Sequence, residues 1–125
     1  MNVTELYYLT VAEVASLLRA KEISPVELLD AYLHRIEDVE PVLNSYILVV
    51  KKEAVLEAKR AEEEIMSGNY IGPLHGVPFA LKDVVDVAGF PNTVGCSIFR
   101  DCISTSDAVI AVSYTHLTLP TKRIV

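Results

Sequence analysis

A single lysine, Lys82, ends a short apolar run inside the segment GPLHGVPFALKDVVDVAGFPNTVG, residues 72–95. This segment holds four of the five glycines and three of the six prolines, so turn-forming residues flank the lysine on both sides. A lysine there has three possible roles: a surface cation, a Schiff-base nucleophile, or a general base whose pKa falls from about 10.4 towards neutrality on burial. Residue type alone favours the surface cation, the common fate of lysine.

The residues around Lys82 favour a more special role. The apolar VPFAL run before it is expected to surround the aliphatic part of the side chain. Asp83 follows directly and could orient the ammonium group or its neighbours. Gly89 and Gly95 would let the backbone approach a ligand closely. This frame supplies a base but no nucleophile.

The other reactive side chains have plainer interpretations. Cys96 and Cys102 are spaced C-x5-C without a nearby histidine, which is poor spacing for zinc and indicates two reduced thiols. His75 either contacts a substrate or has a packing or turn role, and the second is favoured. His34 is expected on the surface of a helix. No metal or cofactor is predicted.

Two helices are predicted behind capping boxes. The first covers residues 11–20 and follows a T-x-x-E box that begins at Thr10. The second follows Ser24 in the sequence SPVE and is expected to end before Pro41, because proline breaks the helical hydrogen-bond ladder.

A third helix is predicted over residues 53–66, closed by Gly68. Its acidic AEEEIM stretch is interpreted as a solvated face that pairs with Lys59 and Arg60. The alternative interpretation of this stretch is an acidic functional site, and the pairing with Lys59 and Arg60 argues against it.

Short strands are predicted over residues 45–50 and 77–81, where apolar and β-branched residues cluster. A further helix is predicted at the STSDAVIAV segment, with Ser104 or Ser106 as its cap and Asp107 in its first turn. Helices that lead into strand–loop–helix units indicate an α/β domain built on a mixed sheet.

Composition narrows the function classes. The chain has 125 residues and a net charge of −6, which disfavours a nucleic-acid surface because phosphate binding needs clustered lysine and arginine. The N-terminus lacks a signal-peptide pattern, and no apolar run reaches the roughly 18 residues that span a membrane. A cytoplasmic protein without membrane contact is expected.

The lysine segment resembles the signature of a known enzyme family. Its residues follow the run G-P-L-x-G-[IV]-P-x-x-[VIL]-K-D and the later A-G-x-P-T-T-x-G-like turn of the amidase signature family. The upstream order of a helix, an EISPVEL helix start, a strand and a Glu/Ala-rich helix is similar too, so the resemblance covers roughly residues 8–111. Asn92 replaces the more usual threonine, and Cys96 stands where serine is common.

The resemblance implies an amide hydrolase with a Ser–cis-Ser–Lys triad, in which Lys82 is the general base. It also implies a small-molecule amide substrate, no cofactor, and the helices and first strands of an incomplete mixed-sheet α/β fold. Both triad serines normally lie downstream in a G-[GS]-S-S-G-G-like loop, which this sequence lacks. The serine pair in CISTSD is better explained by helix capping. The chain by itself is therefore expected to be inactive.

The last residues change character at Val112. VSYTHLTLPTKRIV resembles the conceptual translation of a transposase-type sequencing adapter through Thr121. We therefore expect residues 1–111 to be the N-terminal part of an amidase domain and residues 112–125 to be a non-native tail. A genuine C-terminal strand is the alternative.

Three other functions stay open. The chain could belong to the A subunit of a glutamine-dependent tRNA amidotransferase, although its PLHGVPFALKD wording leans towards a stand-alone amidase. It could be a non-catalytic amidase-like module. A Schiff-base enzyme that uses Lys82 is the third option, and it is the weakest.

Overall fold

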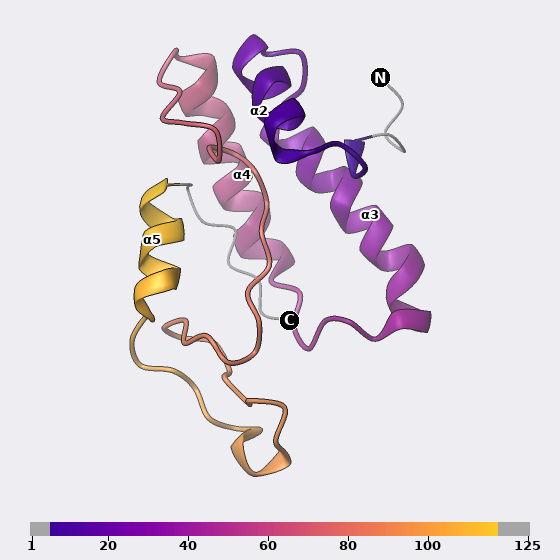
Figure 1. Cartoon of the computed structure of the whole chain (residues 1–125), viewed down its shortest axis with the longest axis vertical. Helices are drawn as coiled ribbons and strands as arrows, with labels where there is room; N and C mark the ends of the chain where they lie inside the picture. Colours follow the sequence, from indigo (N-terminus) through magenta and orange to yellow (C-terminus); the bar gives the residue numbers. More distant parts are fainter. Residues whose placement is uncertain (1–5, 118–125) are drawn as a thin grey trace.

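The computed structural model describes residues 6–117 and is helical in its first half (Figure 1). Its helices are α2 (Val11–Ala20), α3 (Pro25–Leu43), α4 (Lys51–Met66), the 3-10 helix η1 (Ser97–Phe99) and α5 (Val109–Leu117). Helices α3 and α4 pack against each other, and the chain after α4 runs back along that helix before it enters the loops that precede α5 (Figure 1).

Two capping boxes start α2 and α3, as the sequence predicts. The Thr10 hydroxyl accepts the Glu13 N–H, while Glu13 Oε2 accepts the Thr10 N–H at 2.7 Å. Ser24 and Glu27 repeat the arrangement ahead of α3, at 3.1 and 2.8 Å. Each box satisfies backbone donors that would otherwise lack partners, so both helix starts are fixed locally.

The prediction that Pro41 ends the second helix is wrong. Helix α3 contains Pro41 and continues to Leu43, where Asn44 closes it in a left-handed conformation with φ of 49°. Pro41 lies in the last turn, so the N–H that it lacks removes only one bond of the ladder. The Asn44 N–H then bonds to the Glu40 carbonyl at 2.9 Å and completes the helix end.

The third helix begins two residues earlier than predicted, at Lys51, and ends at Met66 as predicted. Its cap is Ser67, and Gly68 follows with φ of 92°. The predicted pairing of the acidic stretch is confirmed for Arg60, whose Nε lies 3.4 Å from Glu64 Oε1.

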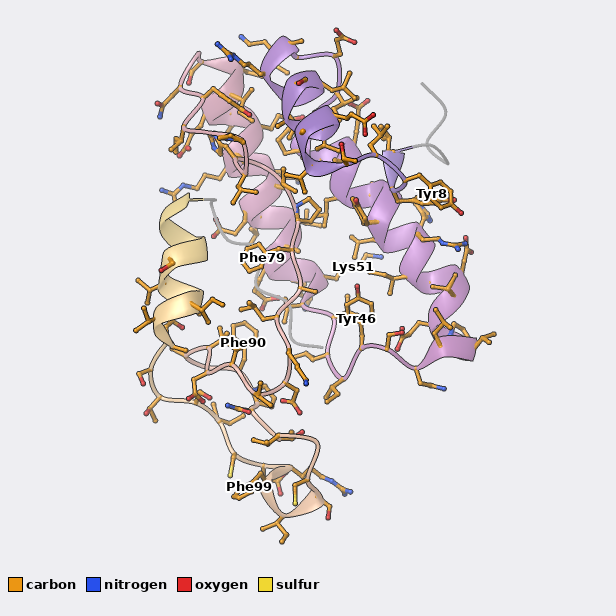
Figure 2. All side chains as sticks on the ribbon, viewed as in Figure 1. Tyr8, Tyr46, Lys51, Phe79, Phe90 and Phe99 are labelled. Atoms are coloured by element: carbon orange, nitrogen blue, oxygen red, sulfur yellow. The ribbon has the colours of Figure 1, made fainter. Side chains whose placement is uncertain are left out.

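The buried apolar side chains form three clusters. The first joins α2 to α3 and the second joins α3 to α4, so the helices share a continuous interior. The third lies beside α5, where Phe79 and Phe90 pack on it (Figure 2). In order, the clusters contain Leu6, Val14, Leu18, Ile23, Leu28 and Ala31; Leu29, Leu33, Ala54 and Ala58; and Leu81, Val87 and Ala111.

Both strand predictions are wrong as secondary structure. Residues 45–50 and 77–81 form no strand, and only Leu48 and Leu81 within them occupy isolated bridges. A strand is defined by its ladder with a neighbour, and within residues 6–117 no such ladder is present. The fold class nevertheless stands, since helices without their sheet are what an incomplete α/β fold contains.

The predicted start of the last helix is also wrong. Helix α5 begins at Val109, and neither predicted serine caps it. The Ser104 hydroxyl instead donates to Asp86 Oδ1 at 2.6 Å, and Asp107 Oδ1 accepts the Ala88 N–H at 2.8 Å. Serine and aspartate are good capping residues by type, but here distant partners compete for the same side chains.

Gly76 is the glycine whose replacement we expect to cost most stability. Its φ is +80°, and a Cβ at this position would lie 2.7 Å from Cγ of the buried Pro25. We expect Gly76→Ala to reduce the free energy of unfolding by about 2 kcal/mol, through left-handed strain and overpacking. Urea denaturation checks this. Gly72→Ala is the matched control, because nothing lies within 4 Å of its Cβ position. Equal stability of the two variants would contradict the prediction.

Candidate active site

Lys82 follows the buried Leu81 and has an exposed side chain. Successive side chains of an extended segment point to opposite sides, so burial of Leu81 directs Lys82 outwards. The Lys82 carbonyl accepts the N–H groups of Val84 and Val85 at 2.8 and 3.0 Å, which turns the chain sharply. Lys82 therefore stands at the end of an extended segment, immediately before a turn.

The expected apolar surroundings of the lysine are not present. Within residues 6–117, Lys82 is open to solvent and its ammonium group makes no hydrogen bond or ion pair. No serine hydroxyl among these residues bonds to it either. The structure thus presents Lys82 without the desolvation that a catalytic base needs, and its catalytic role stays a prediction.

Asp83 orients its neighbours rather than the ammonium group. Its carboxylate is 5% exposed. It accepts the Thr93 N–H at 2.8 Å, the Gly95 N–H at 3.2 Å, and a short hydrogen bond from the Thr93 hydroxyl. Burial by itself would raise the pKa of Asp83, but the bonds from Thr93 and Gly95 outweigh it and hold the pKa below its usual value. The residue beside Lys82 is therefore an ionised clamp on the 93–95 turn.

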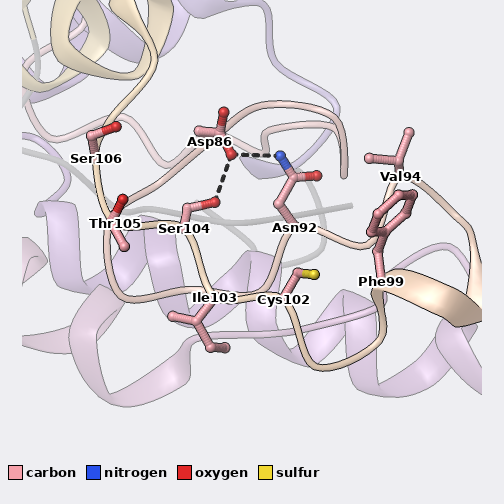
Figure 3. Close-up of a pocket in the computed structure, with 9 residues that line it drawn as sticks. All are labelled: Asp86, Asn92, Val94, Phe99, Cys102, Ile103, Ser104, Thr105 and Ser106. Atoms are coloured by element: carbon pink, nitrogen blue, oxygen red, sulfur yellow. Dashed lines mark hydrogen bonds between the residues drawn. The ribbon is translucent and has the colours of Figure 1, made fainter.

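Sequence reasoning missed a second carboxylate clamp at Asp86 (Figure 3). Asp86 Oδ1 accepts hydrogen bonds from Asn92 Nδ2 at 2.7 Å and from Ser104 Oγ at 2.6 Å (Figure 3). The bond from Ser104, followed by that from Asn92, lowers the pKa of Asp86. The spacing of these residues in the sequence does not indicate the clamp, because Ser104 is distant from Asp86 along the chain and meets it only in the folded structure.

The Asp86 clamp borders an open hollow of about 300 Å³. Its lining mixes hydroxyl, amide and carboxylate groups with a thiol and apolar side chains (Figure 3). The residues that line it are Asp86, Asn92, Val94, Phe99, Cys102, Ile103, Ser104, Thr105 and Ser106. Lys82 is not among them, so the hollow and the lysine are separate features of this chain.

The other predicted residues lie where their plainer interpretations put them. His75 is fully buried, which confirms the packing role, and His34 has a side chain that is 66% exposed. Cys96 and Cys102 are free thiols. In the part of the chain that the structure describes, no group of histidine, cysteine and acidic residues could hold a metal ion. No helix in that part is long and apolar enough to cross a membrane.

Comparison with known proteins gives a consistent result. The family model described as Amidase matches residues 27–116. The chain is 40% identical over 106 residues to the A subunit of the glutamyl-tRNA(Gln) amidotransferase of Carboxydothermus hydrogenoformans, covering 85% of this chain and 22% of that protein. It is 32% identical over 110 residues to an acylamidase of Rhodococcus erythropolis, covering 88% of this chain and 23% of that protein.

Solved structures agree with the sequence comparison. A bacterial aryl acylamidase of the amidase signature family superposes with a TM-score of 0.82 and 26% identity, over 94% of this chain and 24% of that chain. A native peptide amidase from Stenotrophomonas maltophilia gives a TM-score of 0.79 and 25% identity, over 92% and 23%. This chain therefore spans between a fifth and a quarter of the length of each of these four proteins.

Proposed function

This chain belongs to the amidase family, and from that premise we propose that the full-length protein hydrolyses a carboxamide to a carboxylate and ammonia. Residues 1–111 are the N-terminal part of its amidase domain, and residues 112–125 are a non-native tail. The observation that carries the proposal is Lys82: it matches the signature lysine and stands exposed at the end of its segment, with the following turn clamped by Asp83. A cytoplasmic location and a small-molecule amide substrate belong to the same proposal.

In the proposed reaction, Lys82 acts as the general base of a Ser–cis-Ser–Lys triad. Its neutral amine takes a proton from one serine, which takes the proton of the nucleophilic serine. The serine oxygen then attacks the amide carbon, and the C–N bond breaks as the lysine returns its proton through the serine relay to the leaving nitrogen. Ammonia departs, and water hydrolyses the acyl-enzyme. Both serines and the oxyanion donors come from the rest of the domain. That part must also cover Lys82 and exclude water from it, because burial is what favours the neutral form of a lysine that acts as a general base.

The exposed apolar side chains support a larger domain. Side chains that a complete domain would normally bury stand open in this chain, including Ile47 at 56%, Val84 at 51% and Ile98 at 83% exposure. Single exposed apolar residues are common, but here they accompany two extended segments without a sheet. Further strands would cover both features at once.

The second candidate is the A subunit of a glutamine-dependent tRNA amidotransferase. The 40% identity to such a protein favours it. An amidase of Pseudomonas putida is 44% identical, although over only 68% of this chain. Sequence identity therefore does not separate the two functions, and a reaction must.

We expect the purified full-length protein to release ammonia from carboxamides without any partner protein. Ammonia release from a panel of aliphatic and aryl amides, with glutamine included, measures this. A serine-directed phosphonofluoridate should abolish turnover, because the proposed nucleophile is a serine. Turnover of glutamine alone that depends on added partner proteins would favour the amidotransferase. No turnover under either condition would contradict both candidates.

A further inference from the structure

His75 is the one histidine with no exposed surface among those that the structure describes, and it lies under the turn that precedes the Lys82 segment. Its Nδ1 accepts the backbone N–H of Ile71 at 3.2 Å. Its own backbone N–H bonds to the Gly72 carbonyl at 2.9 Å. The imidazole thus closes residues 71–75 into a compact turn, which we call the His75 turn.

The other ring nitrogen faces helix α4. Nε2 of His75 lies 3.3 Å from Glu64 Oε2, although the two atoms do not form a well-aligned hydrogen bond. A neutral imidazole carries one N–H, and the Nδ1 atom that accepts from Ile71 cannot hold it. The proton therefore sits on Nε2, the nitrogen nearer to the Glu64 carboxylate. This contact joins the His75 turn to α4.

We propose that His75 is a positioning residue, held as its Nε2-protonated tautomer, that closes the turn at the start of the Lys82 segment beside α4 and opens that turn when the imidazole is protonated. Protonation puts a hydrogen on Nδ1, which then faces the Ile71 N–H donor to donor. The contact with Glu64 would strengthen, but the bond that closes the turn would be lost. The inference holds whether or not Lys82 is a catalytic base.

The charged and titratable groups around His75 determine the pH at which its imidazole is protonated. From α4 it faces Glu64, which also pairs with Arg60 at 3.4 Å. Tyr70, the residue before the His75 turn, faces it with ring centroids 6.0 Å apart, and the charge of Arg19 on α2 acts on that tyrosine. Glu64 is the charge that acts on His75, and α3 meets the neighbouring Gly76 through the buried Pro25.

Burial lowers the pKa of His75, and the nearby Glu64 carboxylate opposes this only in part. The folded chain therefore binds fewer protons than the unfolded chain just below pH 6.5, the ordinary value for histidine. Stability must then rise with pH in that window and fall as the pH drops from about 6.5 towards the lowered pKa. Asp83 and Asp86 titrate at more acidic pH, so their effects are separate.

Nuclear magnetic resonance of the chain 1–125, labelled with ¹⁵N, tests the tautomer directly. At pH 7.5 we expect the Nδ1 shift of an unprotonated nitrogen, the Nε2 shift of a protonated one, and a protected Ile71 amide. A protonated Nδ1 or an unprotected Ile71 amide would overturn the proposal. The protection factor of the Ile71 amide, which corrects for the slower intrinsic exchange at lower pH, should fall by about five- to tenfold once His75 is protonated.

Matched variants separate positioning from simple packing. His75→Asn keeps an acceptor that can reach the Ile71 N–H but does not titrate, whereas His75→Leu has no acceptor. We expect His75→Asn to retain Ile71 protection and to lose the pH dependence of unfolding that begins below about pH 6.5. We expect His75→Leu to lose both. His34→Asn is the control and should preserve both, because His34 is exposed beside Asp30.

Glu64→Gln provides a readout that packing alone does not predict. Removing the carboxylate should lower the pH at which His75 titrates, because an opposite charge favours the imidazolium. Glu63→Gln, a change at the exposed neighbour, should leave the midpoint unchanged. An unchanged midpoint in Glu64→Gln, or full pH dependence in His75→Asn, would contradict the proposal.

Discussion

Lys82→Ala in the full-length protein is expected to lower kcat/KM for amide hydrolysis by about 10⁴-fold or more, because members of a catalytic triad act as a unit. Without the amine, no group accepts the proton that leaves the serine pair. Substrate binding should change little, so the loss should fall on kcat. Steady-state kinetics with the best amide substrate measures both constants.

Two further variants show whether the loss is chemical. Lys82→Arg keeps the positive charge, but a guanidinium does not deprotonate in proteins and cannot serve as a base. We expect it to be as inactive as Lys82→Ala. Lys52→Ala removes an exposed lysine from α4 and should leave turnover unchanged. Normal activity of Lys82→Arg would show that the lysine supplies only charge and would contradict the proposed mechanism.

Asp83→Ala is expected to destabilise the folded chain by about 3 kcal/mol, since hydrogen bonds to a charged group are each worth about 1.5–3 kcal/mol. The change removes the acceptor for the Thr93 and Gly95 N–H groups and for the Thr93 hydroxyl. Thr93→Val removes the hydroxyl, which donates to Asp83 and also accepts the Gly95 N–H at 3.3 Å, and should cost about 1 kcal/mol. Urea denaturation of the three proteins at pH 7 gives the values.

Asp38→Ala is the control for Asp83, because Asp38 is an exposed carboxylate on α3. We expect it to change stability by less than about 0.5 kcal/mol. Equal effects of Asp38→Ala and Asp83→Ala would show that the clamp contributes nothing.

The Asp83 clamp also predicts a pH dependence of stability, at more acidic pH than the one predicted for His75. The pKa of Asp83 is lower in the folded chain than the ordinary value of about 3.9. Its contribution is therefore complete above about pH 4 and is lost as the pH falls through the lowered folded value. The side chain in Asp83→Asn does not titrate, so the stability of this variant should lose the pH dependence that Asp83 causes at acidic pH.

The helices were predictable because their signals are local. The boxes at Thr10 and Ser24 each need only residues three positions apart, and both lie where the sequence places them. Pro41 misled the prediction because the helix continues past it to Leu43 and closes through the bond from the Asn44 N–H to the Glu40 carbonyl. Residue type alone does not indicate this closure.

The strands and the site were less predictable because they depend on distant partners. Leu48 and Leu81 lie in segments with strand-like composition, yet no ladder within the described residues makes either one a strand. Lys82 was identified from its motif. Its solvent exposure was not predicted, because exposure depends on which parts of the fold pack over the lysine. Asp83 was chosen correctly as an orienting group, although its partners at Thr93 and Gly95 were not identified.

The assignment of residues 1–111 to a Ser–cis-Ser–Lys amidase is tested most directly by sequencing the source gene outward from the codons for Gly72 and past codon 111. We expect the native frame to depart from VSYTHLTLPTKRIV, continue into a helix, and then encode a Gly-Ser-Ser-Gly-type loop that supplies both triad serines. A frame that encodes VSYTHLTLPTKRIV and then stops would leave Lys82 without a nucleophile. That result would contradict the enzymatic role proposed for this protein.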